Sequence, residues 1–449
     1  MKFFSWWSRV AGAANWQTDQ TVNAPWFVPI FFAVGAFGIA SVWMEAALPL
    51  LIVATALDRY RFEFFGAGLR IEHFVFVGVA LAWFLKTRVM GRTGEHKASP
   101  LHFSRADSLL VAYLTIALTS SVLFSPQVRE SLKFFVLMVF GVVLYWLVRA
   151  VAANLQEFTR GVWVMLGVGV AASLFGMVAW LAFPLGVNLG VQTYSLENFT
   201  THSPFGTLFD SNTLGMYAMA ATLLQVTLLL DAQFANYRAW LSIGTVITLI
   251  AVALSLTRVA WLGLGFGFFL ILLFSPRRRW AIAIGGAAAA LVIVALVANS
   301  ALAGGGDALA EFSFARVLTS RSIFFRLDAY QRAWNDFLSS PILGNGVNVF
   351  AQNYTSPSGT RDWISNFFLM ALHDTGIVGL AVLLAWLGWL AYETRRALKN
   401  SRGVARTMLL ALSIAYLALF VTYQATTVFW LGFNWVYLGM IRAGALVKE

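Results

Sequence analysis

Two arginines stand out because they interrupt an otherwise apolar chain. Arg326 opens the stretch RLDAYQRAWNDF, and Arg258 lies between two apolar runs in SLTRVAWLG. A guanidinium group can hold a phosphate through two parallel hydrogen bonds, so both arginines are candidates to bind a diphosphate group. The alternatives are ordinary structural roles. Arg258 would then anchor a turn, and Arg326 with the other arginines of its segment would pair on a solvated surface with Asp328, Asp336 and Asp362.

A third polar group lies in THSPFGTLFDSNTLG, at the mouth of the apolar run that follows it. It brings His202, Asp210 and Asn212 close together in the chain. Helix capping is a sufficient explanation for Asp210 and Asn212, because short polar side chains accept hydrogen bonds from the free N–H groups that begin a helix. Capping leaves His202 without an explanation.

The fourth group lies inside WISNFFLMALHDTGIVGLAVLLAWLGWL, which is long and apolar enough to cross a membrane. Asn366 stands near its start, and His373 and Asp374 lie within it. On a helix Asn366 and His373 share a face and are separated by about 10 Å. Ionisable residues inside membranes usually face the protein interior or a wet cavity and are candidates for function. The alternative is a His–Asp packing pair, with the glycines of GIVG allowing close helix contact.

The elements that must position these residues are membrane helices. Of the 449 residues 59% are hydrophobic and only 11% are charged, whereas a soluble protein carries about a quarter charged residues. The chain has no cysteine and therefore no thiol nucleophile or thiolate metal site. It also lacks a P-loop, an HExxH motif and any cluster with metal-ligand spacing, so we expect neither metal nor cofactor. The basic charge lies in loops between spans, which argues against nucleic acid as a partner.

About 20 apolar residues cross a bilayer, and the hydropathy pattern predicts an all-α polytopic membrane protein with about 12 transmembrane helices. The first span contains Glu45 and Pro49 and is too long for one straight helix, so it is either one broken helix or two short ones. The predicted spans are 27–57, 71–86, 108–125, 132–148, 160–184, 212–230, 239–256, 259–275, 280–300, 364–391, 404–425 and 429–442.

The distribution of Lys and Arg orients the bundle, because cytoplasmic loops carry excess positive charge. Basic clusters in loops 86–107, 276–280 and 392–407 fall on one side, which places both chain ends in the cytoplasm and the long loop before the third-last helix outside. The predicted divisions are a cytoplasmic amphipathic segment over 1–26, a transmembrane bundle over 27–300, an external loop domain over 301–363 and C-terminal helices over 364–449.

The external loop domain contains one predicted amphipathic helix, over residues 322–338. Aromatic residues recur in it at helical spacing and form one apolar stripe. All cations of this domain are arginines, including Arg321 and Arg361, which suits phosphate binding better than lysine would. The predicted stripe consists of Phe325, Tyr330, Trp334 and Phe337, and the helix is expected to end at Pro341, Gly344 and Gly346.

The stretches RLDAYQRAWNDFLSSPILGNGVNVF and SNFFLMALHDTGIVGL resemble the C-terminal region shared by the O-antigen ligase and O-antigen polymerase superfamily. That region has an Arg-led helix with aromatics, then Pro-x-x-Gly-x-Gly, then His-Asn, nine residues and Gly-x-x-Gly. The segments FGTLFDSNTLGMYAMA and LTRVAWLG resemble further family segments, and the likeness covers roughly residues 160–440. The matching positions are Asn212, Arg258, Arg326, Pro341, Gly344, Gly346, Asn366, Asp374, Gly376 and Gly379.

One departure from the family pattern concerns the catalytic group. The histidine that precedes the asparagine, favoured as the catalytic group of ligases, is Ser365 here. The general base is therefore absent, weaker or supplied from elsewhere, and His373 and His202 are the two candidates to replace it. The resemblance and the residues together predict two sets. The catalytic set is Arg258, Arg326, His373, His202 and Ser365, and the substrate-binding set is Asn212, Asn366, Asp374, Tyr330, Arg321 and Arg361.

The resemblance implies a metal-independent membrane glycosyltransferase in the bacterial inner membrane, with its active site facing the periplasm. Its donor would be an undecaprenyl-diphosphate-linked oligosaccharide, and its other partners would be a glycan acceptor, membrane lipids and other polysaccharide assembly proteins. Because Ser365 replaces the ligase histidine, a polymerase of exopolysaccharide or O-antigen is favoured over a ligase. The alternatives are a lipid A-core O-antigen ligase, a transporter or flippase, and an inert scaffold of a polysaccharide assembly complex.

Overall fold

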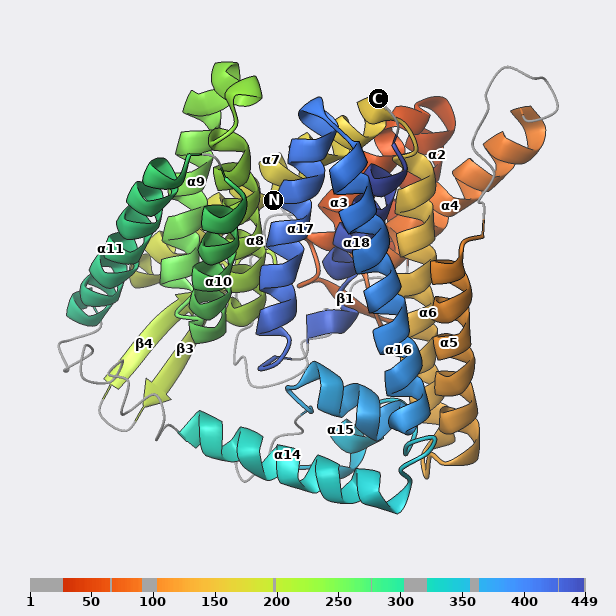
Figure 1. Ribbon diagram of the computed structural model, residues 1–449. Helices are drawn as coiled ribbons and strands as arrows, with labels where there is room; N and C mark the ends of the chain where they lie inside the picture. Colours follow the sequence, from red (N-terminus) through yellow and green to blue (C-terminus); the bar gives the residue numbers. More distant parts are fainter. Residues whose placement is uncertain are drawn as a thin grey trace.

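The computed structural model describes residues 27–64, 67–90, 103–196, 199–275, 277–302, 321–355, 363–426 and 428–447. These residues form a bundle of helices that run mainly along one direction, with one helix lying across an end (Figure 1). The α-helices of these residues are α2 (Phe27–Val42), α3 (Ala47–Thr55), α4 (Ile71–Met90), α5 (Arg105–Leu123), α6 (Val128–Val151), α7 (Leu155–Ala182), α8 (Ser211–Leu229), α9 (Arg238–Leu254), α10 (Arg258–Phe274), α11 (Arg278–Leu302), α14 (Arg321–Ser339), α15 (Val349–Asn353), α16 (Phe367–Asn400), α17 (Gly403–Thr422) and α18 (Gly432–Leu446).

Every predicted span coincides with a helix, and the first coincides with two. Among the described residues, seven helices are long and apolar enough to cross a membrane, and three shorter apolar helices accompany them. The prediction of an all-α polytopic membrane protein is thereby confirmed, while the count of 12 crossings stays a prediction. The seven are Arg105–Leu123, Val128–Val151, Leu155–Leu185, Ser211–Leu229, Ala232–Leu254, Phe367–Asn400 and Gly403–Thr422.

The first predicted span is two helices joined by a short 3-10 turn, η1 (Met44–Ala46). Trp43 leaves the helical region at φ −122° and ψ 87°, which ends α2. Pro49 then falls in the first turn of α3, where its missing N–H group removes no intrahelical hydrogen bond. The predicted break is therefore real, and the proline belongs to a helix start.

Two β-hairpins were not predicted. Strand β1 (Arg61–Phe64) pairs with β2 (Ala67–Arg70), and β3 (Val191–Leu196) pairs with β4 (Phe199–Pro204), both antiparallel. Arg59 links the two regions, because its Nη1 donates to the carbonyl of Leu189 at 2.6 Å and to that of Gly206 at 3.3 Å. The loop around the second hairpin is thus fixed to the N-terminal part of the bundle.

Helix α8 lies at the centre of the bundle. Nearly all of its residues are buried, and none of them is charged. Its packing partners are α9, α10, α17 and α7. On the other side of the bundle, α5 and α6 are joined by a buried ion pair in which Arg149 Nη1 lies 2.8 Å from Asp107 Oδ2. Asp107 also completes a capping box with Ser104 at the start of α5.

Helix α14 lies across the end of the bundle where the β3–β4 hairpin also projects, and the C-terminus lies at the opposite end (Figure 1). Its bounds are close to those of the predicted amphipathic helix. The predicted single aromatic stripe is wrong, however, because Trp334 is 48% exposed while Phe337 is 8% exposed. The helix buries Ala329 and Ala333 instead, since small residues allow the closest approach to the bundle.

The segment after α14 interlocks with a break in α16. Gly376 has φ 65° and ψ −171°, so α16 is interrupted there. The N–H groups beyond the break bond to the loop after α14, Ile377 to the carbonyl of Pro341 at 2.9 Å and Val378 to that of Ile342 at 3.3 Å. The Pro-x-x-Gly-x-Gly and Gly-x-x-Gly motifs are therefore two halves of one structural joint.

The predicted division into four segments stays a prediction. The N-terminal segment 1–26 lies outside the described residues, as do 303–320 and 356–362 of the predicted external loop domain.

Candidate active site

Arg258 is the first residue of α10 and follows a tight turn from α9. Leu256 in this turn has φ 54°, a region that costs a non-glycine residue about 1–2 kcal/mol. Neighbouring elements hold the turn. Ser203 Oγ donates to the carbonyl of Ser255 at 2.6 Å, and Thr257 Oγ1 donates to the carbonyl of Ser211 at 3.1 Å. The side chain of Arg258 is therefore presented from a fixed, strained position.

Arg326 and Tyr330 lie four residues apart on α14 and so share one face of it. Tyr330 Oη donates to the carbonyl of Ser365 at 3.1 Å and to that of Gln424 at 3.5 Å. These two carbonyls lie just before α16 and just after α17. Tyr330 thus aims the face that carries Arg326 at the place where α16 begins and α17 ends.

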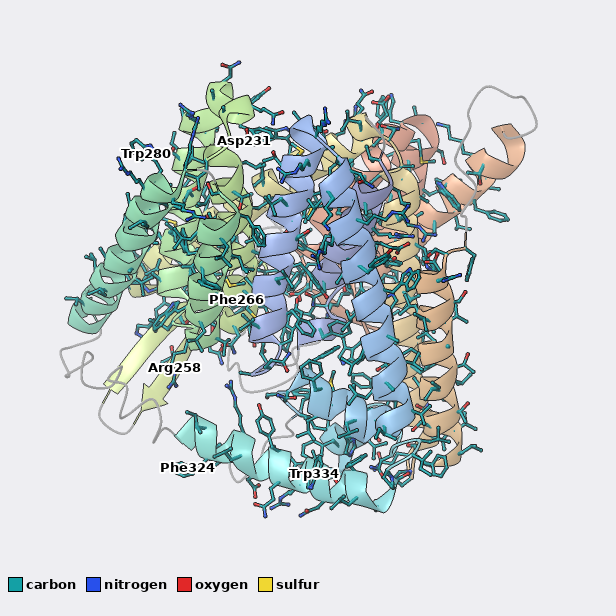
Figure 2. All side chains as sticks on the ribbon, in the orientation of Figure 1. Asp231, Arg258, Phe266, Trp280, Phe324 and Trp334 are labelled. Atoms are coloured by element: carbon teal, nitrogen blue, oxygen red, sulfur yellow. The ribbon has the colours of Figure 1, made fainter. Side chains whose placement is uncertain are left out.

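The two arginines lie within electrostatic range of each other, and each is half-buried. Arg258 stands at the end of α10 that faces α14 (Figure 2). It also adds its charge to the positive end of the α10 dipole, where exposed N–H groups already favour anions. Three sources of positive potential therefore meet at one place.

Within the part of the chain that the structure describes, neither Arg258 nor Arg326 forms an ion pair with an acidic side chain. Asp328 and Asp336, the described aspartates that could have paired with Arg326, contact other residues instead. Asp328 Oδ2 lies 3.3 Å from Arg332 Nε and accepts from Tyr354 Oη at 2.8 Å. Asp336 lies beside His373, and Asp362 falls outside the described residues. Surface pairing therefore does not describe Arg326 with Asp328 or Asp336, but it does describe Arg332, which pairs with Asp328 on the surface of α14.

Asn366 caps α16, because its Oδ1 accepts from the N–H of Leu369 at 2.9 Å, and its Nδ2 donates to the carbonyl of Gln424 at 3.2 Å. Ser365 precedes it and is half-buried. Sequence reasoning missed Gln424, whose buried Oε1 has no hydrogen-bond partner among the residues that the structure describes. Its signal was a polar side chain at the end of an apolar span.

Asn212 lies beside the Arg258 turn, because the neighbouring Ser211 carbonyl accepts the Thr257 hydroxyl. Asp210 behaves as the capping explanation predicts and accepts from the N–H and hydroxyl of Thr213 at 2.7 and 2.6 Å. Asn212 Nδ2 lies 3.5 Å from Asp210 Oδ2. The start of α8, which carries Asn212, therefore lies next to the start of α10, which carries Arg258.

His373 does not join the arginines, which corrects the expectation that it lines the same cavity. It is 1% exposed, with Nδ1 2.9 Å from Asp374 Oδ1 and Nε2 3.8 Å from Asp336 Oδ2. Asp336 follows Arg326 by ten residues, which is about 15 Å along α14. The packing-pair alternative describes His373, because it joins α16 to the far half of α14.

Asp374 is also part of this joint and lies away from the arginines. Its Oδ2 accepts from the N–H of Asn348 at 3.1 Å, and its carbonyl accepts from Ser120 Oγ at 2.7 Å. Asp374 therefore holds the loop after α14 against α5 and α16. The expected substrate-binding role of Asp374 has no support in this geometry.

His202 lies on β4 and likewise faces away from Arg258. Its neighbour Ser203 contacts the α9–α10 turn, and alternate residues of a strand point to opposite sides. The ring packs on Phe183 with centroids 4.6 Å apart, and Nδ1 lies 3.1 Å from Thr193 Oγ1. Burial lowers the pKa of His202 below its ordinary value, so the ring is neutral at pH 7.

We expect His202→Gln to retain product formation within about twofold, because the glutamine amide can keep the bond to Thr193 and no reacting group faces this ring. Loss of a general base would instead lower the reaction rate by about 10²-fold or more. The measurement is glycan product per inserted protein in membranes. A loss of that size in a normally inserted variant would return His202 to the candidate bases.

Two arginines of the predicted substrate-binding set are not placed. Arg321 begins α14, but its side chain lies outside what the structure describes, and Arg361 lies outside the described residues altogether. Among the described residues no group of three or more His, Cys, Asp and Glu could hold a metal ion. The positive charge beside Arg258 comes from the two arginine side chains and the start of α10.

The fold and this cluster define a multi-pass membrane protein with two arginines in electrostatic range of each other at one end of its helices, neither of them paired with an acidic side chain of the described residues. A family model of the O-antigen ligase matches residues 243–384, which confirms the superfamily that the motifs resemble. The match runs from α9 into α16 and includes Arg258, Arg326 and Ser365, whereas Asn212 and His202 precede it. No curated protein matches the chain significantly.

The matched family indicates a glycosyltransferase-like activity of the O-antigen ligase or polymerase type. In general terms such an activity uses a lipid-linked oligosaccharide and a glycan acceptor.

Proposed function

We propose that this protein is a polymerase of bacterial surface polysaccharide, such as exopolysaccharide or O-antigen. It would take an undecaprenyl-diphosphate-linked oligosaccharide as donor, in the inner membrane and on the periplasmic face. The observation that carries the proposal is that Arg258 and Arg326 lie within electrostatic range of each other without an acidic partner among the described residues. Two like charges held together lower stability unless an anion joins them, and a diphosphate is the anion that the matched family handles.

The orientation in this proposal follows from the loop charges. The basic clusters at Arg277 to Arg279 and Arg395 to Arg406 lie at the end of the bundle opposite to Arg258, and cytoplasmic loops carry such excess charge. The arginine pair then faces the periplasm, where the lipid tail of the donor can stay in the outer leaflet.

In the proposed reaction the acceptor hydroxyl oxygen bonds to the anomeric carbon of the donor sugar. The bond from that carbon to the diphosphate oxygen breaks, and its electron pair stays on the diphosphate. Arg258 and Arg326 stabilise this growing charge, because fixed donors in a partly water-excluded site need little reorganisation. The free diphosphate oxygen then takes the proton that the acceptor hydroxyl loses, so atoms and charge balance.

The acceptor hydroxyl still has to be oriented, although neither His373 nor His202 faces the arginines. Ser365, Asn366 and Gln424 supply neutral hydrogen-bonding groups beside Tyr330. We assign them this orienting role, with the proton passing to the diphosphate instead of a histidine. The absence of the ligase histidine at Ser365 favours a lipid-linked acceptor and hence polymerisation. Ligation to lipid A core is the second candidate, favoured by the family that matches residues 243–384.

The test reconstitutes the full chain in liposomes with an undecaprenyl-diphosphate-linked repeat unit, alone or with lipid A core. Gel electrophoresis separates a ladder of lipid-linked polymers from a single ligated species. We expect a ladder with the donor alone. Product only when lipid A core is present would establish the ligase instead, and no product with any repeat unit from the native cell would refute both.

We expect EDTA to leave the rate of product formation unchanged within about twofold, because arginines and the α10 dipole supply the charge stabilisation that a metal would otherwise provide. The measurement compares initial rates in the same liposomes before and after chelation. Loss of activity that Mg²⁺ or Mn²⁺ restores would contradict metal independence without affecting the assignment of the arginines.

A further inference from the structure

A concave site lies at the opposite end of the bundle from Arg258. It is a cavity of about 250 Å³ between the ends of α8 and α10 and the start of α17. Helix α10 has 17 residues and separates this cavity from Arg258 by about 25 Å. The cavity is therefore distinct from the candidate active site.

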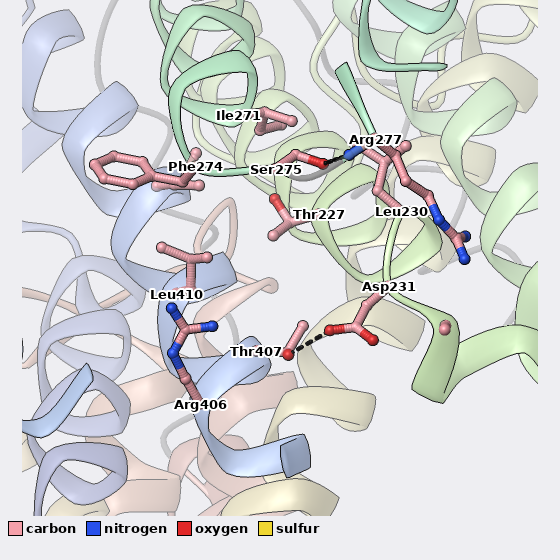
Figure 3. Close-up of a pocket in the computed structure, with 12 residues that line it drawn as sticks. Thr227, Leu230, Asp231, Ile271, Phe274, Ser275, Arg277, Arg406, Thr407 and Leu410 are labelled. Atoms are coloured by element: carbon pink, nitrogen blue, oxygen red, sulfur yellow. Dashed lines mark hydrogen bonds between the residues drawn. The ribbon is translucent and has the colours of Figure 1, made fainter. Parts of the chain in front are cut away.

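Two arginines flank the cavity, Arg406 on the α17 side and Arg277 on the α10–α11 side (Figure 3). Neither forms an ion pair with an acidic side chain of the described chain. Arg406 Nε donates to the carbonyl of Leu398 at 3.1 Å, which holds the guanidinium group while leaving its two Nη groups for another acceptor. Guanidinium groups in this state bind phosphate oxygens well.

The single carboxylate of the cavity does not neutralise these arginines. Asp231 Oδ2 accepts from Thr407 Oγ1 at 2.6 Å, and Oδ1 accepts from the N–H of Gln233 at 2.9 Å. Asp231 is thus used to cap the segment after α8 and to fix it to α17. The lining keeps a surplus of positive charge. The hydroxyl group of Ser275, which accepts from the N–H of Arg277 at 3.1 Å, is a further donor, whereas the hydroxyl group of Thr227 donates to the carbonyl of Leu223 at 2.7 Å.

The deeper lining is apolar. Ile271 and Ile414 are buried, and Leu410 and Phe274 continue the apolar surface toward the outside, where Phe274 is 58% exposed. A free nucleotide or inorganic phosphate has no apolar part that could pack against this surface. A phosphate joined to acyl chains matches both parts of the site, because basic pockets between membrane helices on the cytoplasmic side suit anionic headgroups.

We propose that this cavity binds the phosphate headgroup of one anionic phospholipid from the leaflet around the Lys- and Arg-rich end of the bundle. Arg277 and Arg406 bind the phosphate, and the acyl chains follow the apolar surface of α10 and α17. The inference stands apart from the proposed glycan reaction. A lipid in this place bridges α8, α10 and α17, the helices that also carry Asn212, Arg258 and Gln424 at their other ends.

The test uses delipidated full-length protein, titrated with phosphatidylglycerol, phosphatidylcholine or inorganic phosphate, with bound molecules counted by native mass spectrometry. We expect one tightly held phosphatidylglycerol and weak binding of phosphatidylcholine. Each arginine is expected to contribute about fivefold in affinity, so Arg277→Gln combined with Arg406→Gln should weaken binding by about 25-fold. The wild-type comparison of two lipids tests the proposal even if this variant fails to fold.

The matched control is Arg278→Gln combined with Arg279→Gln, which removes the same charge from exposed neighbours outside the cavity. It should keep phosphatidylglycerol affinity within about threefold. Equal weakening by both pairs would mean general surface attraction and would overturn the site. Equal retention of the two lipids by the wild type would do the same. Displacement of the lipid by equimolar inorganic phosphate would show a free-anion site instead.

Discussion

Replacing Arg326 with alanine is expected to reduce glycan product formation by about 10² to 10³, the usual effect of removing one fixed donor to a developing charge. Arg258→Ala should have a similar effect. The physical reason is that both guanidinium groups act on the same diphosphate, so the loss of either leaves part of the leaving-group charge unstabilised. The measurement is polymer or ligated product per inserted protein, in liposomes or in complemented cells.

The same two variants should unfold no more easily than the wild type. Arg258 and Arg326 repel each other, and neither has an acidic partner among the described residues whose charge would be left unpaired. Each alanine therefore removes repulsion, and the unfolding temperature is expected to stay equal or rise. A structural arginine would behave in the opposite way, because its loss would lower stability and activity together.

Replacing either arginine with lysine tests whether the positive charge alone is sufficient or whether the planar guanidinium group is also needed. Lysine keeps the cation but loses the planar fork, so we expect Arg326→Lys to recover only part of the activity. Arg332→Ala is the matched control, since Arg332 lies on the same helix, is exposed and pairs with Asp328. It should retain nearly full activity. Normal glycan chain length in cells that carry only the Arg326→Ala protein would contradict the assignment of the arginine pair to diphosphate binding.

Gly376→Ala is expected to lower the free energy of unfolding by about 2–4 kcal/mol, through backbone strain and steric overlap. The φ of 65° with ψ −171° is a region that only glycine adopts readily. A Cβ atom there would also overlap the carbonyl of Ile342. The loop after α14 would be forced out of the α16 break, and Arg326 would lose its fixed position. The measurement is thermal or denaturant unfolding in detergent.

Gly388→Ala supplies the control for this variant. Gly388 lies on the same helix with no atom within 4 Å of the added Cβ, so alanine should stabilise that turn by about 0.5–1 kcal/mol. If Gly376→Ala were as stable as Gly388→Ala, the interlock between the two glycine motifs would not be what holds α14 in place.

The sequence by itself determined the class of the protein and the position of its helices. Apolar runs of about 20 residues have one stable form in a bilayer, because a helix satisfies all of its backbone hydrogen bonds internally. Glu45 and Pro49 marked the break between α2 and α3 for a similar local reason. The sequence also indicated Arg258 and Arg326 as functional candidates, because burying a charged side chain within an apolar membrane segment is energetically unfavourable.

Only the tertiary structure decided which polar residues meet. Arg258 and Arg326 are far apart in the chain, and their adjacency depends on α14 crossing the end of the bundle, which no local pattern encodes. The sequence around His373 and Asp374 is equally compatible with residues that line a cavity and with a buried packing pair. Their contacts with Asp336 and with the loop after α14 show that they form a packing pair. Residue types and spacing are local properties, whereas a charge's partners are set by long-range contacts.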